Sequence, residues 1–117
     1  FRHREAGARQ VLASSVYRSA HFIEHGDRGE PDLKQLLEQL LPAELVLVEG
    51  FKSYPIEKIE VHRPSVGKPC LYPNDELVVA LACDEAVPDC ALPFFALEDV
   101  AGIADFILLQ TKLKRAS

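Results

Sequence analysis

The sequence predicts an α/β fold in which a mostly parallel β-sheet is flanked by helices. Two apolar runs, residues 45–48 and 77–82, lack the alternation of a half-exposed strand. Such runs are typical of strands buried on both faces. A leucine-rich helical pattern over residues 33–41 comes shortly before the first run. A strand, a helix and a strand that follow one another with short links favour a parallel βαβ unit with a right-handed crossover.

The first 24 residues predict a helix followed by two short strands. Residues 1–9 have a helical pattern, which Gly7 weakens by about 1 kcal/mol relative to alanine. Residues 10–15 and 19–24 lie on either side of a short link at residues 17–18, and we expect each to form a short strand.

A capped amphipathic helix is expected next. Asp32 has the side chain preferred at a helix N-cap, and Pro42 ends the pattern because proline cannot continue a helix. Between them, leucines recur at the spacing of one helix face: Leu33, Leu36, Leu37, Leu40 and Leu41. This face is interpreted as a packing surface.

The C-terminal half predicts three more strands and a last helix. Residues 59–63 alternate apolar and polar side chains, which indicates a strand with one solvated face. Residues 77–82 form the second buried strand, and residues 93–97 are expected to form a short edge strand. Residues 98–112 predict a helix that is apolar around much of its circumference, and therefore buried on the sheet or at an interface.

Composition excludes several classes of partner. The net charge of −5 over 117 residues argues against non-specific binding to nucleic acid or to an acidic membrane surface. No apolar run approaches the length of a membrane span. Three scattered cysteines, Cys70, Cys83 and Cys90, favour reduced thiols in a cytoplasmic protein. A zinc site from Cys83, Cys90 and a distant histidine is the alternative, although structural zinc normally uses closely spaced ligand pairs.

Two acids follow the two apolar runs at equivalent positions, Glu49 after the first and Asp84 after the second. In a parallel sheet both acids would lie at the edge where α/β folds bind ligands. In a phosphate-binding domain, Glu49 would hold Mg²⁺ directly or through water. The N–H of Gly50 would approach a terminal phosphate, and Lys52 would add a positive charge. Asp84 would accept hydrogen bonds from a base with N–H donors, such as guanine.

The plainer interpretation of these acids is structural. Glu49 can be an exposed residue in an ordinary turn after a core strand, and Asp84 a helix cap or a turn residue beside Glu85. The sequence contains no GxxxxGK[ST] phosphate loop and no GxGxxG dinucleotide turn. No nucleophile–base pair is visible either, so a stand-alone enzyme is unsupported.

The basic start of the chain is a second candidate site. Arg2 and Arg9 lie seven residues apart and could share a helix face that binds phosphate or carboxylate, with Arg4 in the same segment. The alternative is a solvated helix end in which an arginine pairs with Glu5.

Four segments together resemble the molybdopterin-guanine dinucleotide biosynthesis protein B (MobB) family. They occur in order at residues 2–8 (RHREAGA), 45–52 (LVLVEGFK), 58–63 (KIEVHR) and 77–84 (LVVALACD). The resemblance covers nearly the whole chain, and the combination of segments is more specific than any one of them.

The resemblance implies a P-loop NTPase-like fold. It implies a GTP-binding accessory protein of molybdenum cofactor biosynthesis, which assists the enzyme that attaches GMP to molybdopterin. The expected ligands are GTP and Mg²⁺, and the expected assembly is a homodimer. The intact parent is expected to have at most a weak GTPase activity. Glu49 and Gly50 would stand in a Walker-B-like position, and Arg2 and Arg4 would lie near the nucleotide or the pterin.

Members of that family begin with a strand, a phosphate-binding loop and its helix. Residues 1–117 are therefore expected to be the C-terminal two-thirds of a single P-loop GTPase-like domain, with the first strand and phosphate loop missing. By itself such a piece should bind nucleotide poorly. The alternative function is a non-catalytic dimerisation or docking module, which the apolar residues 94–109 favour.

Overall fold

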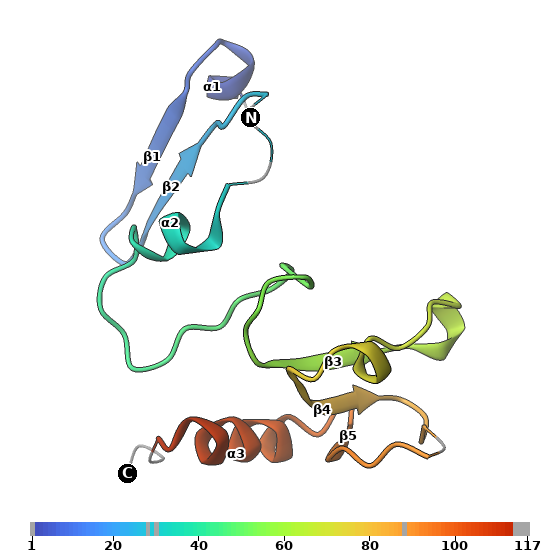
Figure 1. Cartoon of the computed structure of the whole chain (residues 1–117). Helices are drawn as coiled ribbons and strands as arrows, with labels where there is room; N and C mark the ends of the chain where they lie inside the picture. The colour runs from blue at the N-terminus through green and yellow to red at the C-terminus, as the bar shows by residue number, and fades with distance from the viewer. Residues whose placement is uncertain (1, 28, 30, 88, 114–117) are drawn as a thin grey trace. The chain divides into compact units, whose positions relative to one another are not determined.

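The computed structural model describes residues 2–27, 29, 31–87 and 89–113 (Figure 1). The chain divides into two compact units at the boundary between Val46 and Leu47. Each unit has its own sheet: two strands in the first unit and three in the second.

An antiparallel hairpin forms the sheet of the first unit. Strands β1 (Gln10–Ser14) and β2 (Ser19–Ile23) pair from Gln10 with Ile23 to Ser14 with Ser19. The Ser15 N–H donates to the Arg18 carbonyl at 2.8 Å, and this bond closes the connecting turn. Both strands predicted for this region are confirmed.

The first helix is shorter than predicted. Helix α1 (Arg2–Glu5) has only four residues, whereas the sequence pattern extended to residue 9. Gly7 has a φ of +96°, a left-handed conformation that glycine adopts without steric cost and that cannot continue an α-helix. The prediction of a helix beyond Glu5 was wrong for this reason.

Helix α2 (Leu33–Leu37) begins as predicted and ends early. Asp32 is its N-cap, and the Asp32 carboxylate accepts a hydrogen bond from the Lys34 N–H at 3.4 Å. The helix ends four residues before Leu41, which is 87% exposed. Because most helical stability in proteins comes from packing an apolar face, leucines as exposed as Leu41 do not extend the helix to the proline.

Three parallel strands form the sheet of the second unit, in the order β3-β4-β5. They are β3 (Lys58–His62), β4 (Val78–Cys83) and β5 (Phe94–Ala96). Two short 3-10 helices, η1 (Pro64–Val66) and η2 (Tyr72–Asn74), lie in the connection from β3 to β4. The predicted apolar strand over residues 77–82 and the predicted short edge strand are confirmed, and both lie in a parallel sheet.

The core of the second unit centres on β4. The most buried residues described in this unit include Val78, Ala80, Leu81, Ala82 and Cys83. Helix α3 (Val100–Thr111) follows β5, and Asp99 caps it by accepting from the Gly102 N–H at 3.0 Å. The rings of Phe95 and Phe106 meet edge to face, with centroids 5.5 Å apart, so α3 packs against the strand that precedes it.

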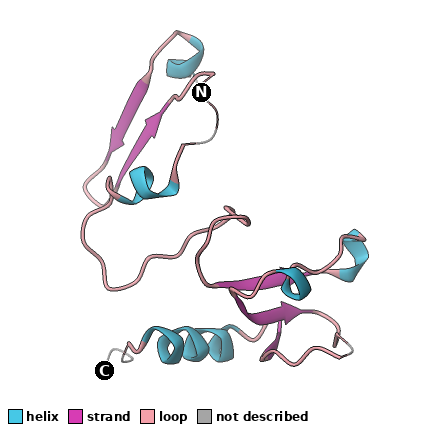
Figure 2. Ribbon diagram, in the orientation of Figure 1, coloured by secondary structure: helices cyan, strands magenta, loops and turns pink. Residues whose placement is uncertain are grey.

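The first apolar run does not form a strand. Figure 2 shows loop throughout from α2 to β3, and residues 45–48 pair with no described strand. Leu47 is 74% exposed, so the prediction of a strand buried on both faces was wrong. A β-strand needs a neighbour to satisfy its N–H and C=O groups, and among the described residues β2 pairs with β1, antiparallel, and with no other strand. The predicted parallel βαβ unit around α2 is therefore not formed.

Strand β3 is present, but its solvated face is opposite to the predicted one. Glu60 is only 8% exposed, whereas Val61 is 65% exposed. The Glu60 carboxylate accepts hydrogen bonds from the Leu71 N–H at 2.7 Å and from the Tyr72 N–H at 3.0 Å. A buried carboxylate is tolerated when it is hydrogen-bonded, and these two bonds also tie the β3–β4 connection to β3.

A partly buried ion pair links the start of β3 to the segment before β4. The Lys58 Nζ lies 2.8 Å from one carboxylate oxygen of Asp75, and the Leu77 N–H donates to the other oxygen at 3.0 Å. The hydrogen bond from Lys58, the bond from Leu77 and the charge of Lys58 lower the pKa of Asp75 from its ordinary 3.8.

We expect Asp75→Asn to lower the urea midpoint of unfolding at neutral pH. Because the folded-state pKa of Asp75 is depressed, the ionised carboxylate stabilises the fold above pH 3.8, and this contribution is lost as the pH falls through the folded-state pKa. The difference between wild type and variant should therefore shrink on acidification. The exposed residue next to it, Glu76, provides the control, since Glu76→Gln should change the urea midpoint neither at neutral pH nor at acid pH. A difference that persists in acid would contradict this assignment.

Candidate functional site

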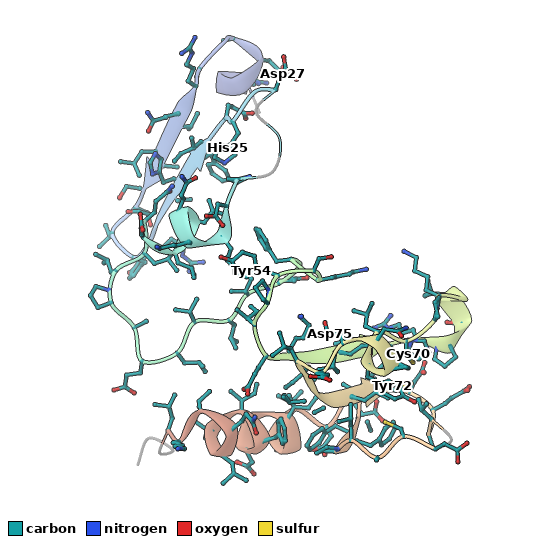
Figure 3. The ribbon with its side chains drawn as sticks, viewed as in Figure 1. His25, Asp27, Tyr54, Cys70, Tyr72 and Asp75 are labelled. Carbon is teal, nitrogen blue, oxygen red and sulfur yellow. The ribbon has the colours of Figure 1, made fainter. Side chains whose placement is uncertain are left out.

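The predicted Glu49–Lys52 segment forms a sharp turn in the second unit. Gly50 has a φ of +85° and Phe51 a φ of +53°, so two successive residues are left-handed. The Phe51 carbonyl accepts from the Tyr54 N–H at 3.0 Å, and the two rings pack edge to face with centroids 6.5 Å apart (Figure 3 labels Tyr54). A bulky residue at positive φ costs about 1–2 kcal/mol, and such strain is concentrated at functional sites.

Glu49 and Lys52 are both exposed on this turn. A Cβ added to Gly50 would meet no atom within 4 Å, so the glycine is required by its backbone angle and not by crowding. The open space beside the Gly50 backbone is compatible with the approach of a phosphate oxygen. The roles of Glu49, Gly50 and Lys52 in binding stay predictions.

Gly50→Ala should lower the free energy of unfolding by about 1 kcal/mol, because alanine is disfavoured at positive φ. Gly50→Asn should cost less, since asparagine tolerates the left-handed region better. Urea denaturation of both variants measures the difference. If alanine were tolerated as well as asparagine, the turn would not have this left-handed conformation.

Asp84 lies at the carboxyl edge of the parallel sheet, directly after the central strand β4. Its side chain is exposed, and one oxygen lies 3.8 Å from the Cys83 Sγ. His62 pairs with Cys83, so Arg63 follows β3 at the same edge. This edge is where open α/β sheets bind their ligands. Asp84 lies at this edge as expected, whereas Glu49 does not follow any strand of this sheet.

The basic candidates belong to the first unit. Arg2 is exposed at the start of α1, and the side chain of Arg4 lies outside the described residues. Arg9 follows the end of α1, so the expectation that Arg2 and Arg9 share a helix face was wrong. The other candidate site residues belong to the second unit.

A second constellation, which the sequence reasoning missed, lies on the sheet of the second unit. Glu60, His62 and Cys70 present a carboxylate, an imidazole and a thiol whose ligand atoms all lie within 4.8 Å of one another. Burial is the main cause that raises the pKa of the Cys70 thiol, and the negative charges of Glu60, Cys83 and Cys90 raise it further. The one available signal was the spacing of Glu60 and His62, because side chains two apart on a strand share a face.

Comparison with known proteins identifies similar sequences. The profile of the family described as molybdopterin guanine dinucleotide synthesis protein B (MobB) matches residues 1–84. The molybdopterin-guanine dinucleotide biosynthesis adapter protein of Escherichia coli (strain K12) is 38% identical over 109 residues, which cover 90% of this chain and 61% of that protein. The protein of the same name from Haemophilus influenzae is 37% identical over 108 residues, which cover 92% of this chain and 59% of that protein.

The chain thus spans about three fifths of the length of these curated relatives. Among the described residues, no helix combines the length and apolar character needed to cross a membrane.

Proposed function

Because this chain belongs to the molybdopterin guanine dinucleotide synthesis protein B (MobB) family, we propose that it is a GTP-binding accessory protein of molybdenum cofactor biosynthesis. In this role it assists the enzyme that attaches GMP to molybdopterin. The family match over residues 1–84 carries the proposal, because that span includes every candidate site residue from Arg2 to Asp84. Both relatives are named adapter proteins, which supports an accessory role.

The nucleotide site is proposed for a P-loop NTPase-like fold. Glu49 holds Mg²⁺ directly or through water, and the backbone of Gly50 and the charge of Lys52 face the phosphates. Asp84 accepts hydrogen bonds from the N–H donors of guanine. The parallel order of β3, β4 and β5 and the position of Asp84 at their carboxyl edge support this arrangement. The basic segment with Arg2 and Arg4 lies near the bound nucleotide or the pterin.

We further propose that residues 1–117 are the C-terminal two-thirds of a single P-loop GTPase-like domain. These residues contain no GxxxxGK[ST] loop, and they cover 61% and 59% of the two relatives. GTP binding is therefore tested on the protein that includes the preceding segment, called the full-length protein below. Three free cysteines support a cytoplasmic location for it.

Reconstitution with the partner enzyme tests the accessory function. The full-length protein is added to the enzyme that attaches GMP to molybdopterin, and formation of the guanine dinucleotide is followed with time. We expect faster formation and a complex of the two proteins on gel filtration. An unchanged rate together with no complex would overturn the proposal.

A second candidate function is a dimerisation or docking module, and exposed apolar side chains on α3 favour it. Phe106 packs against Phe95 of β5, whereas Leu109 is 80% exposed. Val100 is also exposed, but it lies nine residues earlier and therefore on the opposite side of the helix from Leu109. Leu109 is therefore the apolar side chain on α3 that we propose as the contact for a partner. The molecule that binds this surface of α3 is either a second copy of this chain or the partner enzyme.

Leu109→Asp should weaken such an assembly at least tenfold, because a buried unpaired carboxylate is strongly unfavourable. Ala104→Asp, also on an exposed position of α3, is the matched control. Light scattering measures the mass of the protein alone, and gel filtration measures the complex with the enzyme. A monomer that binds no enzyme in any variant would exclude the docking module.

A further inference from the structure

The Glu60–His62–Cys70 constellation has the composition of a transition-metal site. Imidazole nitrogen, thiolate sulfur and carboxylate oxygen are the three ligand types that proteins use for Zn²⁺. Mg²⁺ and Ca²⁺ prefer oxygen ligands alone, so a thiol and an imidazole select against them. None of Glu49, Gly50, Lys52 or Asp84 belongs to the constellation, so its ligands are a different set of side chains from those of the proposed nucleotide site.

The backbone brings the three side chains together from two elements. Glu60 and His62 alternate along β3 and therefore lie on the same face of the sheet. Cys70 arrives from the β3–β4 connection, between η1 and η2 (Figure 3 labels Cys70 and Tyr72). The two N–H groups that Glu60 holds belong to Leu71 and Tyr72, so the same carboxylate fixes the position of the adjacent Cys70.

The distances are compatible with one ion. All three ligand atoms lie within 4.8 Å of one another. Zinc–ligand bonds of about 2.0–2.3 Å place the ligands of a tetrahedral site about 3.3–3.8 Å apart, so shifts of about 1 Å or less would close the site. Side-chain rotation supplies movements of this size.

The hydrogen bonds that would orient a metal-binding carboxylate are already present at Glu60. A carboxylate offers about four lone-pair sites, and the N–H groups of Leu71 and Tyr72 use two of them. The remaining lone pairs are available to a cation. Backbone donors that orient a ligating carboxylate are a regular part of protein metal sites.

We propose that Glu60, His62 and Cys70 bind one Zn²⁺ ion, with a water molecule in the fourth position. The ion ties the β3–β4 connection to β3. Because the metal binds the folded arrangement, it stabilises the second unit, and this stabilisation grows with the logarithm of the free zinc concentration once that exceeds the Kd.

Metal titration of the chain tests this site. The protein is stripped with a chelator under reducing conditions and titrated with ZnCl₂, and bound zinc is measured by elemental analysis. We expect one equivalent of zinc and a raised melting temperature. Cys70→Ser and His62→Gln should each weaken zinc binding at least tenfold. The matched control is Cys90→Ser, a half-buried thiol outside the constellation, which should bind zinc like wild type.

Cobalt substitution provides a readout that does not depend on the folding of any variant. Co²⁺ in the wild-type site should show thiolate-to-cobalt charge transfer in the near ultraviolet. Absence of stoichiometric zinc, or a cobalt spectrum without the thiolate band, would overturn the site. Equal loss of zinc in Cys70→Ser and Cys90→Ser would also overturn it, since the ligands would then be different thiols.

Discussion

Replacing Leu81 by alanine is expected to lower the free energy of unfolding by about 2–5 kcal/mol. Leu81 is fully buried in the central strand β4, between β3 and β5, where it pairs with Glu60 and Phe94. The alanine removes apolar contacts and leaves a cavity that a paired central strand cannot collapse to fill. Because small domains are stable by only about 5–15 kcal/mol, this single change should remove a large part of the stability. Urea denaturation followed by circular dichroism measures it.

Leu47→Ala is the control for this substitution. Leu47 is 74% exposed in the loop before β3, so its truncation should change the stability by no more than about 0.5 kcal/mol. Similar losses for the two variants would contradict the structure described above. That result would mean that residues 45–48 are buried, as the apolar run by itself predicted.

Glu49→Gln in the full-length protein should weaken Mg²⁺-dependent GTP binding at least tenfold, which corresponds to about 1.4 kcal/mol. Glutamine keeps the size of the side chain and removes the charge that a hard cation prefers. Glu49 is exposed, so the variant should fold with unchanged stability. The matched control is Glu44→Gln, an exposed acid five residues earlier in the chain. Calorimetric titration with GTP in the presence of Mg²⁺ measures both affinities.

If Glu49→Gln left the affinity for GTP unchanged, Glu49 would be an exposed turn residue without a role in metal binding. A loss shared equally by Glu44→Gln would point to general electrostatics instead of a metal ligand. Repeating the titration without Mg²⁺ separates these explanations, because the effect of a metal ligand disappears when the metal is removed.

The elements predicted correctly are those whose stability is determined locally. The β1–β2 hairpin needs only its own two strands and a short turn, and Asp32 caps α2 through a hydrogen bond within its own first turn. The apolar run of β4 and the largely apolar helical segment of α3 were also sufficient to predict these two elements.

The elements predicted wrongly depend on neighbours that a local pattern does not contain. Residues 45–48 have the composition of a buried strand, but they have no described strand to pair with. Leu41 has the spacing of a helix face without a surface to pack on. On β3, alternation alone cannot show that Glu60 is buried, because its burial depends on the N–H groups of Leu71 and Tyr72, which lie 11 and 12 residues further along the chain.

The candidate site was predictable to a similar extent. Asp84 could be placed at the carboxyl edge because it directly follows a strong apolar strand. The left-handed backbone at Phe51 has no sequence signature, and Cys70 approaches His62 only through an irregular connection. Sequence reasoning therefore locates site residues that regular elements carry, and misses those that loops bring together.

The central claim, that this chain belongs to a GTP-binding accessory protein, is tested most directly by calorimetric titration of the full-length protein with GTP and Mg²⁺. We expect saturable binding that requires Mg²⁺ and is weaker for ATP, because in the proposed site the N–H groups of guanine donate hydrogen bonds to Asp84. Absence of GTP binding by the folded full-length protein in the presence of Mg²⁺ would contradict the claim.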